Sequence, residues 1–176
     1  TRCDMFSPKG IDKGSQQLTS VFSTKLFGEV ADLGAGWGYL SKEALRLNEK
    51  ITRITLFESN YSAYLASKKN IDDERATFRW ASLENITNLK RRFNHIICNP
   101  PFHSGRYKDL NLLKSFIFHS SRLINAQGCV WMVFVSGLYL ENELKEYFEN
   151  IKILHRDNHY FVCQLLKPKT RGYKHV

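Results

Sequence analysis

Short apolar segments alternate with helix-like segments along most of this 176-residue chain. The segments between them repeat apolar residues at helical spacing, most clearly in the stripe over 109–124, which we expect to be core rather than a ligand site. Such alternation predicts an α/β fold in which a mostly parallel sheet carries helices on both faces. We expect strands at 30–33, 53–57, 77–80, 94–98 and 129–135, and helices at 15–27, 39–47, 61–69, 109–124 and 140–148.

The end of the chain departs from this alternation. Residues 151–155 and 160–166 read as two strands joined by the short polar turn 156–159, which predicts an antiparallel hairpin. The length of the chain and its 43% hydrophobic content are typical of one globular unit. We therefore expect a single domain covering 1–176.

The composition of the chain indicates the cellular compartment in which it works. The longest apolar run, from Cys129 to Val135, has seven residues, far fewer than a membrane span needs, and no signal peptide opens the chain. The chain has four cysteines, and no two of them form a CxxC pair; they are Cys3, Cys98, Cys129 and Cys163. The sequence therefore predicts a cytoplasmic protein with reduced cysteines, those in the strand-like runs being buried.

A glycine-rich turn follows the first expected strand. The sequence Gly34-Ala35-Gly36-Trp37-Gly38 leads directly into the helix at 39–47, and glycines let a backbone approach a ligand closely. The GxGxG spacing differs from the GxGxxG of nicotinamide dinucleotide sites, which makes an oxidoreductase the weaker interpretation. Glu58 ends the next strand, where a carboxylate accepts both hydroxyls of a ribose.

A second polar turn, Asn99-Pro100-Pro101-Phe102-His103, closes the apolar run that begins at Phe93. The Asn99 side-chain oxygen and the Pro100 carbonyl form a pair of acceptors suited to one planar amino group, and Phe102 would stack on the ring that carries it. The alternative is a rigid turn that only ends the strand. His103 would contact a base or a phosphate, or lie on the surface of the turn.

Together the two turns resemble the cofactor loop and NPP[YF] motif of class I S-adenosylmethionine-dependent methyltransferases that act on nitrogen. The opening segment 6–16 (FSPKGIDKGSQ) and the segment 99–105 (NPPFHSG) further resemble the catalytic domain of the ribosomal RNA guanine-N2 methyltransferases in the small methyltransferase family. That resemblance covers nearly the whole chain. It implies a Rossmann-like domain with a seven-stranded sheet, S-adenosylmethionine as cofactor, and RNA of the small ribosomal subunit as substrate.

The resemblance also implies roles for individual residues. Asp32 would lie near the cofactor's ammonium or a bound water, or would cap the glycine turn. Ser82 would contact adenine or only shape a turn, because Leu83 stands where the family usually has Asp or Asn. The segment containing Asp12 would fold over the methionine end or cap the first helix, with Gly14-Ser15 as its turn and cap. The implied groups are catalytic Asn99, Pro100 and Phe102; cofactor-binding Asp32, Gly34, Gly36, Gly38, Glu58, Ser82, Gly14 and Ser15; and substrate-binding Pro101, His103, Arg106 and Lys108.

Positive charge is concentrated in the second half of the chain. The formal net charge is +9, and residues 89–176 hold 14 Lys/Arg against 6 Asp/Glu. Such an excess suits a polyanionic substrate, although it also describes a solvated basic surface. We expect 1–28 to form an amino-terminal motif and helix, 29–88 the cofactor half, and 89–176 the substrate half, whose basic clusters are 90–92, 167–174 and the pair at 106 and 108.

Other interpretations stay open. The same NPPF site would suit an adenine-N6 or a protein glutamine methyltransferase, and the fold would also suit an RNA-binding or assembly module without activity. His155 and His159 have an HxxxH spacing but no third ligand nearby, so we expect no metal. The chain begins at Thr1, as a fragment or trimmed product would, and members of the resembled family often carry an additional amino-terminal domain. We expect a monomer.

Overall fold

A computed structural model describes residues 11–86, 93–101, 103–104, 107–138 and 140–169, with the backbone alone described at 103–104 and 107–108. Its centre is a seven-stranded sheet in the order β3-β2-β1-β4-β7-β9-β8. The strands are β1 (Gly28–Leu33), β2 (Ile51–Glu58), β3 (Ala76–Trp80), β4 (Phe93–Cys98), β7 (Ile124–Val135), β8 (Phe148–Arg156) and β9 (Tyr160–Pro168). The first five strands of the sheet order pair in parallel, which confirms the predicted α/β class.

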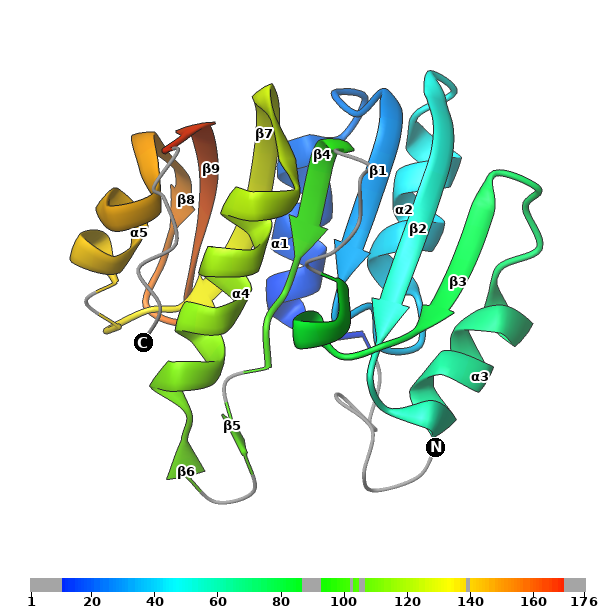
Figure 1. The fold of residues 1–176 in the computed structure, drawn as a ribbon, viewed down its shortest axis with the longest axis horizontal. Helices are drawn as coiled ribbons and strands as arrows, with labels where there is room; N and C mark the ends of the chain where they lie inside the picture. The colour runs from blue at the N-terminus through cyan, green and yellow to red at the C-terminus, as the bar shows by residue number, and fades with distance from the viewer. Residues whose placement is uncertain (1–10, 87–92, 102, 105–106, 139, 170–176) are drawn as a thin grey trace.

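Helices cover both faces of this sheet. Figure 1 shows α1 (Lys13–Phe22) and α2 (Tyr39–Leu47) behind it, and α4 (Leu110–Leu123) and α5 (Glu141–Tyr147) in front. The helix α3 (Tyr61–Asn70) lies beside the outer strand β3. Successive residues of β1 serve opposite faces: Val30 belongs to the apolar cluster that holds α1 and α2, and Ala31 to the cluster that holds α4 and α5.

The carboxyl edge of the parallel strands is the lower edge in Figure 1. The glycine turn follows β1 there, Glu58 ends β2, and Asn99 follows β4. A short ribbon of β5 (His103–Ser104) and β6 (Tyr107–Lys108) extends below this edge. Because ligands bind at the carboxyl ends of strands in open α/β sheets, this edge is where a functional site belongs.

The first helix differs from its predicted limits of 15–27. It begins at Lys13, and its N-cap is Asp12, whose side chain accepts a hydrogen bond from the Ser15 backbone N–H at 2.9 Å, so Gly14 and Ser15 lie inside the helix. It ends at Phe22 because Thr24 adopts a left-handed conformation with φ of 61°. The buried residue Leu26 continues the apolar pattern from outside the helix.

The carboxyl-terminal hairpin forms as predicted. Strand β9 lies between β7 and β8 and is antiparallel to both. Its turn is shaped by Asp157, whose Oδ1 accepts the backbone N–H groups of His159 and Tyr160, each at 2.7 Å. The hairpin brings Tyr160, at the start of β9, to the carboxyl edge of the sheet.

Other elements extend the sequence prediction. Strand β7 starts at Ile124, ahead of the predicted 129, and a 3₁₀ turn (Leu83–Ile86) follows β3.

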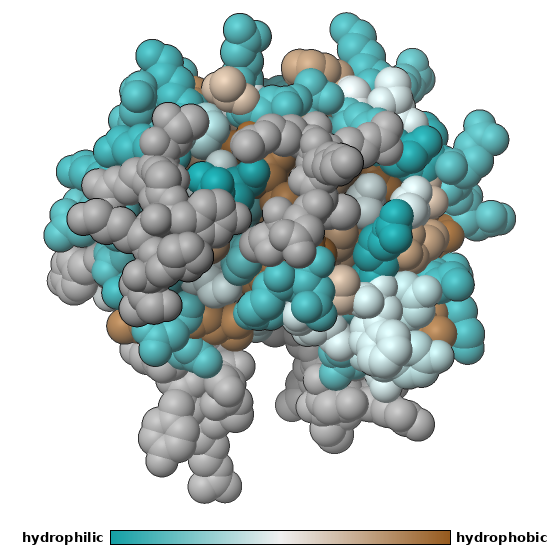
Figure 2. Space-filling view, in the orientation of Figure 1, coloured by the Kyte–Doolittle hydropathy of each residue, from teal (hydrophilic) through white to brown (hydrophobic). Residues whose placement is uncertain are grey.

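Cys98, Cys129 and Cys163 are free and buried, as expected for the three cysteines that the structure describes. None of the described helices is long and apolar enough to cross a membrane. On the face shown in Figure 2, hydrophilic side chains surround apolar ones near the middle of the molecule.

Candidate functional site at the carboxyl edge

Two hollows meet at the carboxyl edge of the sheet, and Gly34 and Asn99 line both of them. The larger has a volume of about 250 Å³ and the smaller about 30 Å³. Among the described residues, the larger is lined by Gly34, Gly36, Glu58, Ser59, Asn60, Ala63, Ser82, Leu83, Glu84, Asn99, Pro101, Leu112 and Phe116. The smaller is lined by Asp12, Ser15, Gly34, Ala35, Trp37, Tyr39, Leu40 and Asn99.

The glycine turn forms the floor where the hollows meet. Gly34 has a φ of 72°, and a Cβ added there would lie 3.1 Å from the Phe116 ring. Gly38 has a φ of 90°, and a Cβ there would lie 2.8 Å from the Ile71 side chain. These contacts and left-handed conformations explain why the turn needs glycine. Because Gly34 lines both hollows and has no side chain, its backbone is exposed to whatever fills them.

Glu58 fastens this turn to the end of β2. Its Oε2 accepts the Gly36 backbone N–H at 2.8 Å, and its Oε1 accepts the Asn60 backbone N–H at 2.7 Å. A carboxylate has about four lone-pair positions, so each oxygen keeps one for a ligand. The side chain thus presents a fixed pair of acceptors to the larger hollow.

Asn99 has a defined side-chain orientation. Its Nδ2 donates to Asp12 Oδ2 at 2.7 Å and to Ser15 Oγ at 2.8 Å. Because an ionised carboxylate only accepts hydrogen bonds, the atom facing Asp12 must be the amide nitrogen. None of the described residues donates to Asn99 Oδ1, so this oxygen is available as an acceptor. Pro100 beside it is buried, and Pro101 is half-buried on the wall of the larger hollow.

Asp12 joins three segments that are distant in the chain. Besides Asn99 after β4, its carboxylate accepts the Ser15 N–H of α1 at 2.9 Å and, through Oδ1, the Tyr160 hydroxyl of β9 at 3.3 Å. Burial, followed by the Asp12 charge and hydrogen bond, raises the pKa of Tyr160. Gly14 does not line either hollow among the described residues; a Cβ there would lie 3.0 Å from both Asp12 Oδ2 and the Tyr160 ring. Its lack of a side chain lets this network close.

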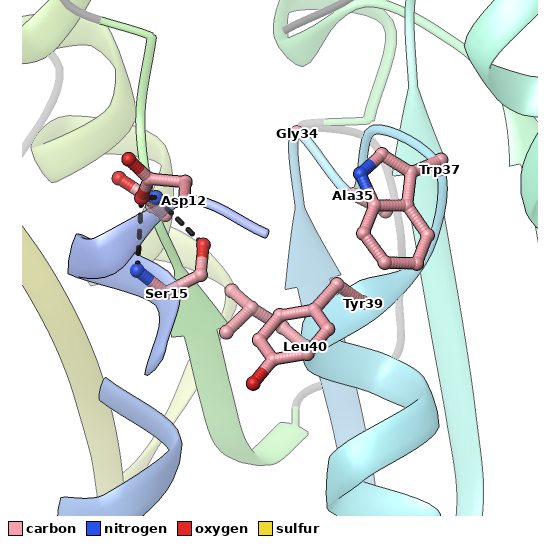
Figure 3. A pocket seen from close by; sticks show the side chains of 8 residues that line it. Asp12, Ser15, Gly34, Ala35, Trp37, Tyr39 and Leu40 are labelled. Atoms are coloured by element: carbon pink, nitrogen blue, oxygen red, sulfur yellow. Dashed lines mark hydrogen bonds between the residues drawn. The ribbon is translucent and has the colours of Figure 1, made fainter. Parts of the chain in front are cut away.

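Two aromatic rings face the Asp12 network across the smaller hollow. Figure 3 shows Asp12 and Ser15 on one side, and Trp37, Tyr39 and Leu40 on the other. The Trp37 and Tyr39 ring centroids lie 5.6 Å apart. Sequence reasoning treated the turn only through its glycines and did not identify these rings. Their position directly beside the GxGxG glycines was the available signal.

Asp32 lies beneath the glycine turn and is completely buried. Its Oδ2 accepts the Ser41 hydroxyl of α2 at 2.7 Å, while its Oδ1 has no hydrogen-bond partner among the described residues. Burial raises its pKa to about 7; the Ser41 hydrogen bond opposes this shift and the Glu58 charge adds to it. Asp32 does not line either hollow in the described part of the chain. It ties β1 to α2 instead.

The end of the larger hollow beyond Glu58 is built by Ser82, Leu83 and Glu84. Hydrogen bonds to the Glu84 carboxyl, first from its own backbone and then from the Ser82 hydroxyl, lower the pKa of that carboxyl. Leu83 is 9% exposed and packs into the core cluster on the α4 side. Sequence reasoning singled out Ser82 but missed Glu84, an acceptor on the same wall.

The stripe on α4 is buried in the core, as expected. Leu113 and Ile117 are buried away from the hollows, as expected. Phe116 is buried too, yet its ring lines the larger hollow under Gly34, and the neighbouring Leu112 lines it as well. Phe116 thus belongs to the core and also borders the larger hollow, because helical spacing shows which face is apolar but not what lies beyond that face.

Several sequence-predicted residues fall elsewhere. Phe102, Arg106 and the cluster 90–92 lie outside the described residues, as do 170–174. His103 pairs with Lys108 across the β5–β6 ribbon, which places both backbones below the carboxyl edge. His155 lies 3.3 Å from Asp157 in the β8–β9 turn. Within the described ranges no three His, Cys, Asp or Glu side chains are grouped so that they could hold a metal ion.

Comparison with known proteins gives this geometry a context. The sequence profile of the family described as "Methyltransferase small domain" matches residues 1–164. The chain is 31% identical over 160 residues to a protein of Buchnera aphidicola (subsp. Schizaphis graminum) named ribosomal RNA small subunit methyltransferase C, covering 91% of this chain and 47% of that protein. It is 33% identical over 144 residues to the protein of that name from Escherichia coli O1:K1, covering 82% and 42%.

A solved structure supports the same fold. The 16S rRNA N2 G1207 methyltransferase of T. thermophilus, in complex with AdoMet and guanosine, superposes with a TM-score of 0.80 at 24% identity. The match covers 93% of this chain and 45% of that one. The chain thus spans a little under half the length of the relatives it matches.

Proposed function

The chain belongs to the methyltransferase small domain family, and from that premise we propose that it transfers a methyl group from S-adenosylmethionine to the exocyclic N2 amino group of a guanine in small-subunit ribosomal RNA. The observation that carries this proposal is the orientation of Asn99. Its amide nitrogen is held by Asp12 and Ser15 at the junction of the two hollows, so its oxygen is left to accept from a substrate.

The residues of the larger hollow fit the cofactor. Glu58 would accept the ribose hydroxyls with the lone pairs that Gly36 and Asn60 leave. The backbone at Gly34 and Gly36 would border the amino-acid end of the cofactor, and the wall at Ser82 and Glu84 would meet the adenine. Gly38 lines neither hollow among the described residues and would act by shaping the turn. Asp32, buried under the turn, would support Gly34 from below rather than touch the ligand.

Asn99 and Pro100 would hold the target amino group. The amino group of guanine is a weak nucleophile, because its lone pair is delocalised into the ring. Accepting its two N–H bonds at Asn99 Oδ1 and the Pro100 carbonyl favours a pyramidal nitrogen and disperses the charge that develops there. When bound, the cofactor would supply an electrophilic methyl group to the nitrogen lone pair, with the S–C electron pair staying on sulfur and a nitrogen proton leaving to solvent.

Positioning provides most of the rate in such a reaction. Well-oriented reactants gain roughly 7–11 kcal/mol from proximity alone. Phe102 would stack on the target base, which requires that the base be unpaired or flipped out of a helix. Pro101 would form the wall against which that base lies, and His103 would contact the base or an adjacent phosphate.

Charge supports RNA as the substrate. The 14 Lys/Arg of residues 89–176 exceed the 6 Asp/Glu there; Lys108 belongs to β6, and Arg106 precedes it by two positions in the sequence. We propose that this half of the chain faces the RNA backbone while 29–88 holds the cofactor, within one domain spanning 1–176. The site of action would be the cytoplasm, where ribosomal subunits are assembled, with the chain acting as a monomer and without a metal.

Incubation with S-adenosylmethionine labelled at the methyl group tests the proposal. The chain is offered total RNA, isolated small ribosomal subunits or soluble protein, and the labelled product is digested and separated. We expect N2-methylguanosine from the RNA or the subunits. N6-methyladenosine or methylglutamine would instead assign the other amino methyltransferase activities, and binding of RNA without label transfer would assign a non-catalytic module.

A further inference from the structure

We propose that Asp12 is a positioning residue that fixes the direction of the Asn99 side-chain amide, and that Tyr160 and Gly14 hold Asp12 in place for this task. The inference rests on the proposed function, since it concerns the acceptor that Asn99 would offer to the target amino group. It assigns Asp12 to the acceptor side of the site, rather than to the cofactor or to helix capping alone.

The two ends of an asparagine amide have nearly the same shape, so packing alone does not choose between them. The choice matters here because a reversed Asn99 would point an N–H donor at the N–H donors of the target. Asp12 Oδ2, 2.7 Å from Asn99 Nδ2, accepts hydrogen bonds only and therefore selects one orientation. The Ser15 hydroxyl, at 2.8 Å, can donate or accept and so cannot select alone.

The Asp12 carboxylate is itself held from two sides. The Ser15 N–H binds Oδ2 at 2.9 Å, and the Tyr160 hydroxyl donates to Oδ1 at 3.3 Å. Gly14 lies between them, and a Cβ there would come within 3.0 Å of both Oδ2 and the Tyr160 ring. An alanine at 14 would be tightly packed against both groups, which would have to move slightly to make room for it. The start of α1 is thus shaped around the Asp12 carboxylate.

The negative charge gives a second effect in the same direction. A hydrogen bond from Nδ2 to a carboxylate polarises the amide, and hydrogen bonds in such chains strengthen one another. Asn99 Oδ1 therefore becomes a better acceptor. Through this polarisation the Asp12 charge stabilises the positive charge that develops on the target nitrogen, without touching it.

Two substitutions separate this role from helix capping. Asp12→Asn keeps an oxygen that accepts from both Ser15 N–H and Asn99 Nδ2, and turns its own amide nitrogen toward the Tyr160 oxygen. Asp12→Ser keeps a good N-cap but has a side chain one atom shorter, which cannot support Asn99. We expect Asp12→Ser to lower kcat by about 100-fold, the loss typical of one preorganised polar group. Asp12→Asn keeps the acceptor and loses only the charge, so we expect it to lower kcat by only a few-fold.

The Kd for S-adenosylmethionine, measured by calorimetry, and the thermal midpoint should match wild type in both variants. The measurement uses the substrate that gives N2-methylguanosine with the wild-type chain. If Asp12→Ser loses cofactor affinity in step with kcat, Asp12 is a cofactor contact. If both variants lose kcat equally, or neither does, the amide direction does not depend on this acceptor. Each of these outcomes overturns the inference while the active wild type keeps the proposed function; an inactive wild type would overturn both.

A readout without turnover completes the test. The side-chain NH₂ resonances of Asn99, identified by their loss in Asn99→Ala, should shift in Asp12→Ser and stay near the wild-type position in Asp12→Asn. Asp109→Ser is the matched control, because Asp109 caps α4 through the Leu112 N–H at 2.9 Å without contacting Asn99. Resonances that do not move in Asp12→Ser would show that the carboxylate does not hold the amide.

Discussion

Asp12 and Asn99 are 87 residues apart in the chain, yet Asp12 Oδ2 accepts the Asn99 side-chain N–H at 2.7 Å. This hydrogen bond joins the start of the first helix to the end of β4, at the point where the two hollows of the carboxyl edge meet. It determines which atom of the Asn99 amide faces a ligand. The proposed chemistry depends on that atom being oxygen.

Replacing Asn99 by alanine should abolish methyl transfer while leaving cofactor binding intact. The substitution removes one of the two acceptors for the target amino group, and the loss of one preorganised polar group costs about 100-fold or more in kcat. Glu58 and the glycine turn would still hold the cofactor. Single-turnover assays and calorimetry check this, and wild-type turnover in the variant would remove Asn99 from the acceptor role.

Glu58→Ala should weaken cofactor binding more than it lowers turnover at saturation. The carboxylate accepts the Gly36 and Asn60 N–H groups, so its loss frees the turn as well as the proposed ribose contact. A lost hydrogen bond to a charged group is worth roughly 1.5–3 kcal/mol, which predicts a rise in Kd of about tenfold or more. Glu43→Gln, on an exposed ion pair of α2, is the control. An unchanged Kd for Glu58→Ala would contradict the assignment.

Asp32→Asn should remove a pH dependence from the stability of the protein. Burial raises the folded-state pKa of Asp32 from 3.8 to about 7, so between these values the folded state binds more protons than the unfolded chain. The contribution of Asp32 to stability is therefore fully present below pH 3.8 and is lost as the pH rises toward 7. The steepest slope is about 1.4 kcal/mol per pH unit.

Urea unfolding of wild type and Asp32→Asn between pH 5 and pH 8 measures this difference, and the variant should gain stability relative to wild type as the pH rises. Asp73→Asn is a control with the opposite sign, because hydrogen bonding to Arg75 lowers the pKa of Asp73 below 3.8. The contribution of Asp73 to stability is lost only as the pH falls below 3.8, so Asp73→Asn should show no pH-dependent difference from wild type between pH 5 and pH 8. Parallel curves for wild type and Asp32→Asn would show that burial does not hold a proton on this carboxyl.

Gly38→Ala should destabilise the protein more than Gly36→Ala. Both glycines have positive φ, at 90° and 57°, so an alanine costs about 1–2 kcal/mol of backbone strain at either position. Only at Gly38 would the new Cβ collide with a packed side chain, since it would lie 2.8 Å from Ile71, whereas no heavy atom of the described structure lies within 4 Å at Gly36. Denaturation midpoints that are equal or reversed would contradict this packing.

Tyr160→Phe should lower kcat a few-fold and leave the cofactor Kd unchanged. The hydroxyl donates to Asp12 Oδ1 at 3.3 Å, a long hydrogen bond that steadies the carboxylate without selecting its orientation. Loss of cofactor affinity would show that Tyr160 serves the cofactor instead. Steady-state kinetics with saturating RNA and a parallel calorimetric titration distinguish the two results.

The fold was predictable from the sequence because each of its strands and helices carries its own local pattern. The run from Val30 through the glycines to Leu40 specifies a strand, a turn and a helix with short-range information alone. The end of α1 was not predictable, because Leu26 continues the apolar pattern although Thr24 has already left the helical conformation. Periodicity records which residues are buried but not the backbone geometry between them.

Several residues that line the two hollows were predictable from the sequence, but their contacts were not. The positions of Asn99, Glu58 and the glycines follow from strand ends, which meet at one edge of a parallel sheet. The bond between Asp12 and Asn99 and that between Tyr160 and Asp12 require three distant segments to be placed to within an ångström, which no local pattern encodes. Phe116 belongs to the core as predicted, but its place on the wall of the larger hollow was not predictable, since a buried ring can face a cavity as well as a neighbour.

Nucleoside analysis of RNA methylated by the chain with labelled S-adenosylmethionine tests the central claim most directly, with Asn99→Ala as the paired reaction. The account predicts label in N2-methylguanosine for the wild type and none for the variant, while both bind the cofactor equally. Label in any other product, or label in N2-methylguanosine that persists in Asn99→Ala, would contradict it.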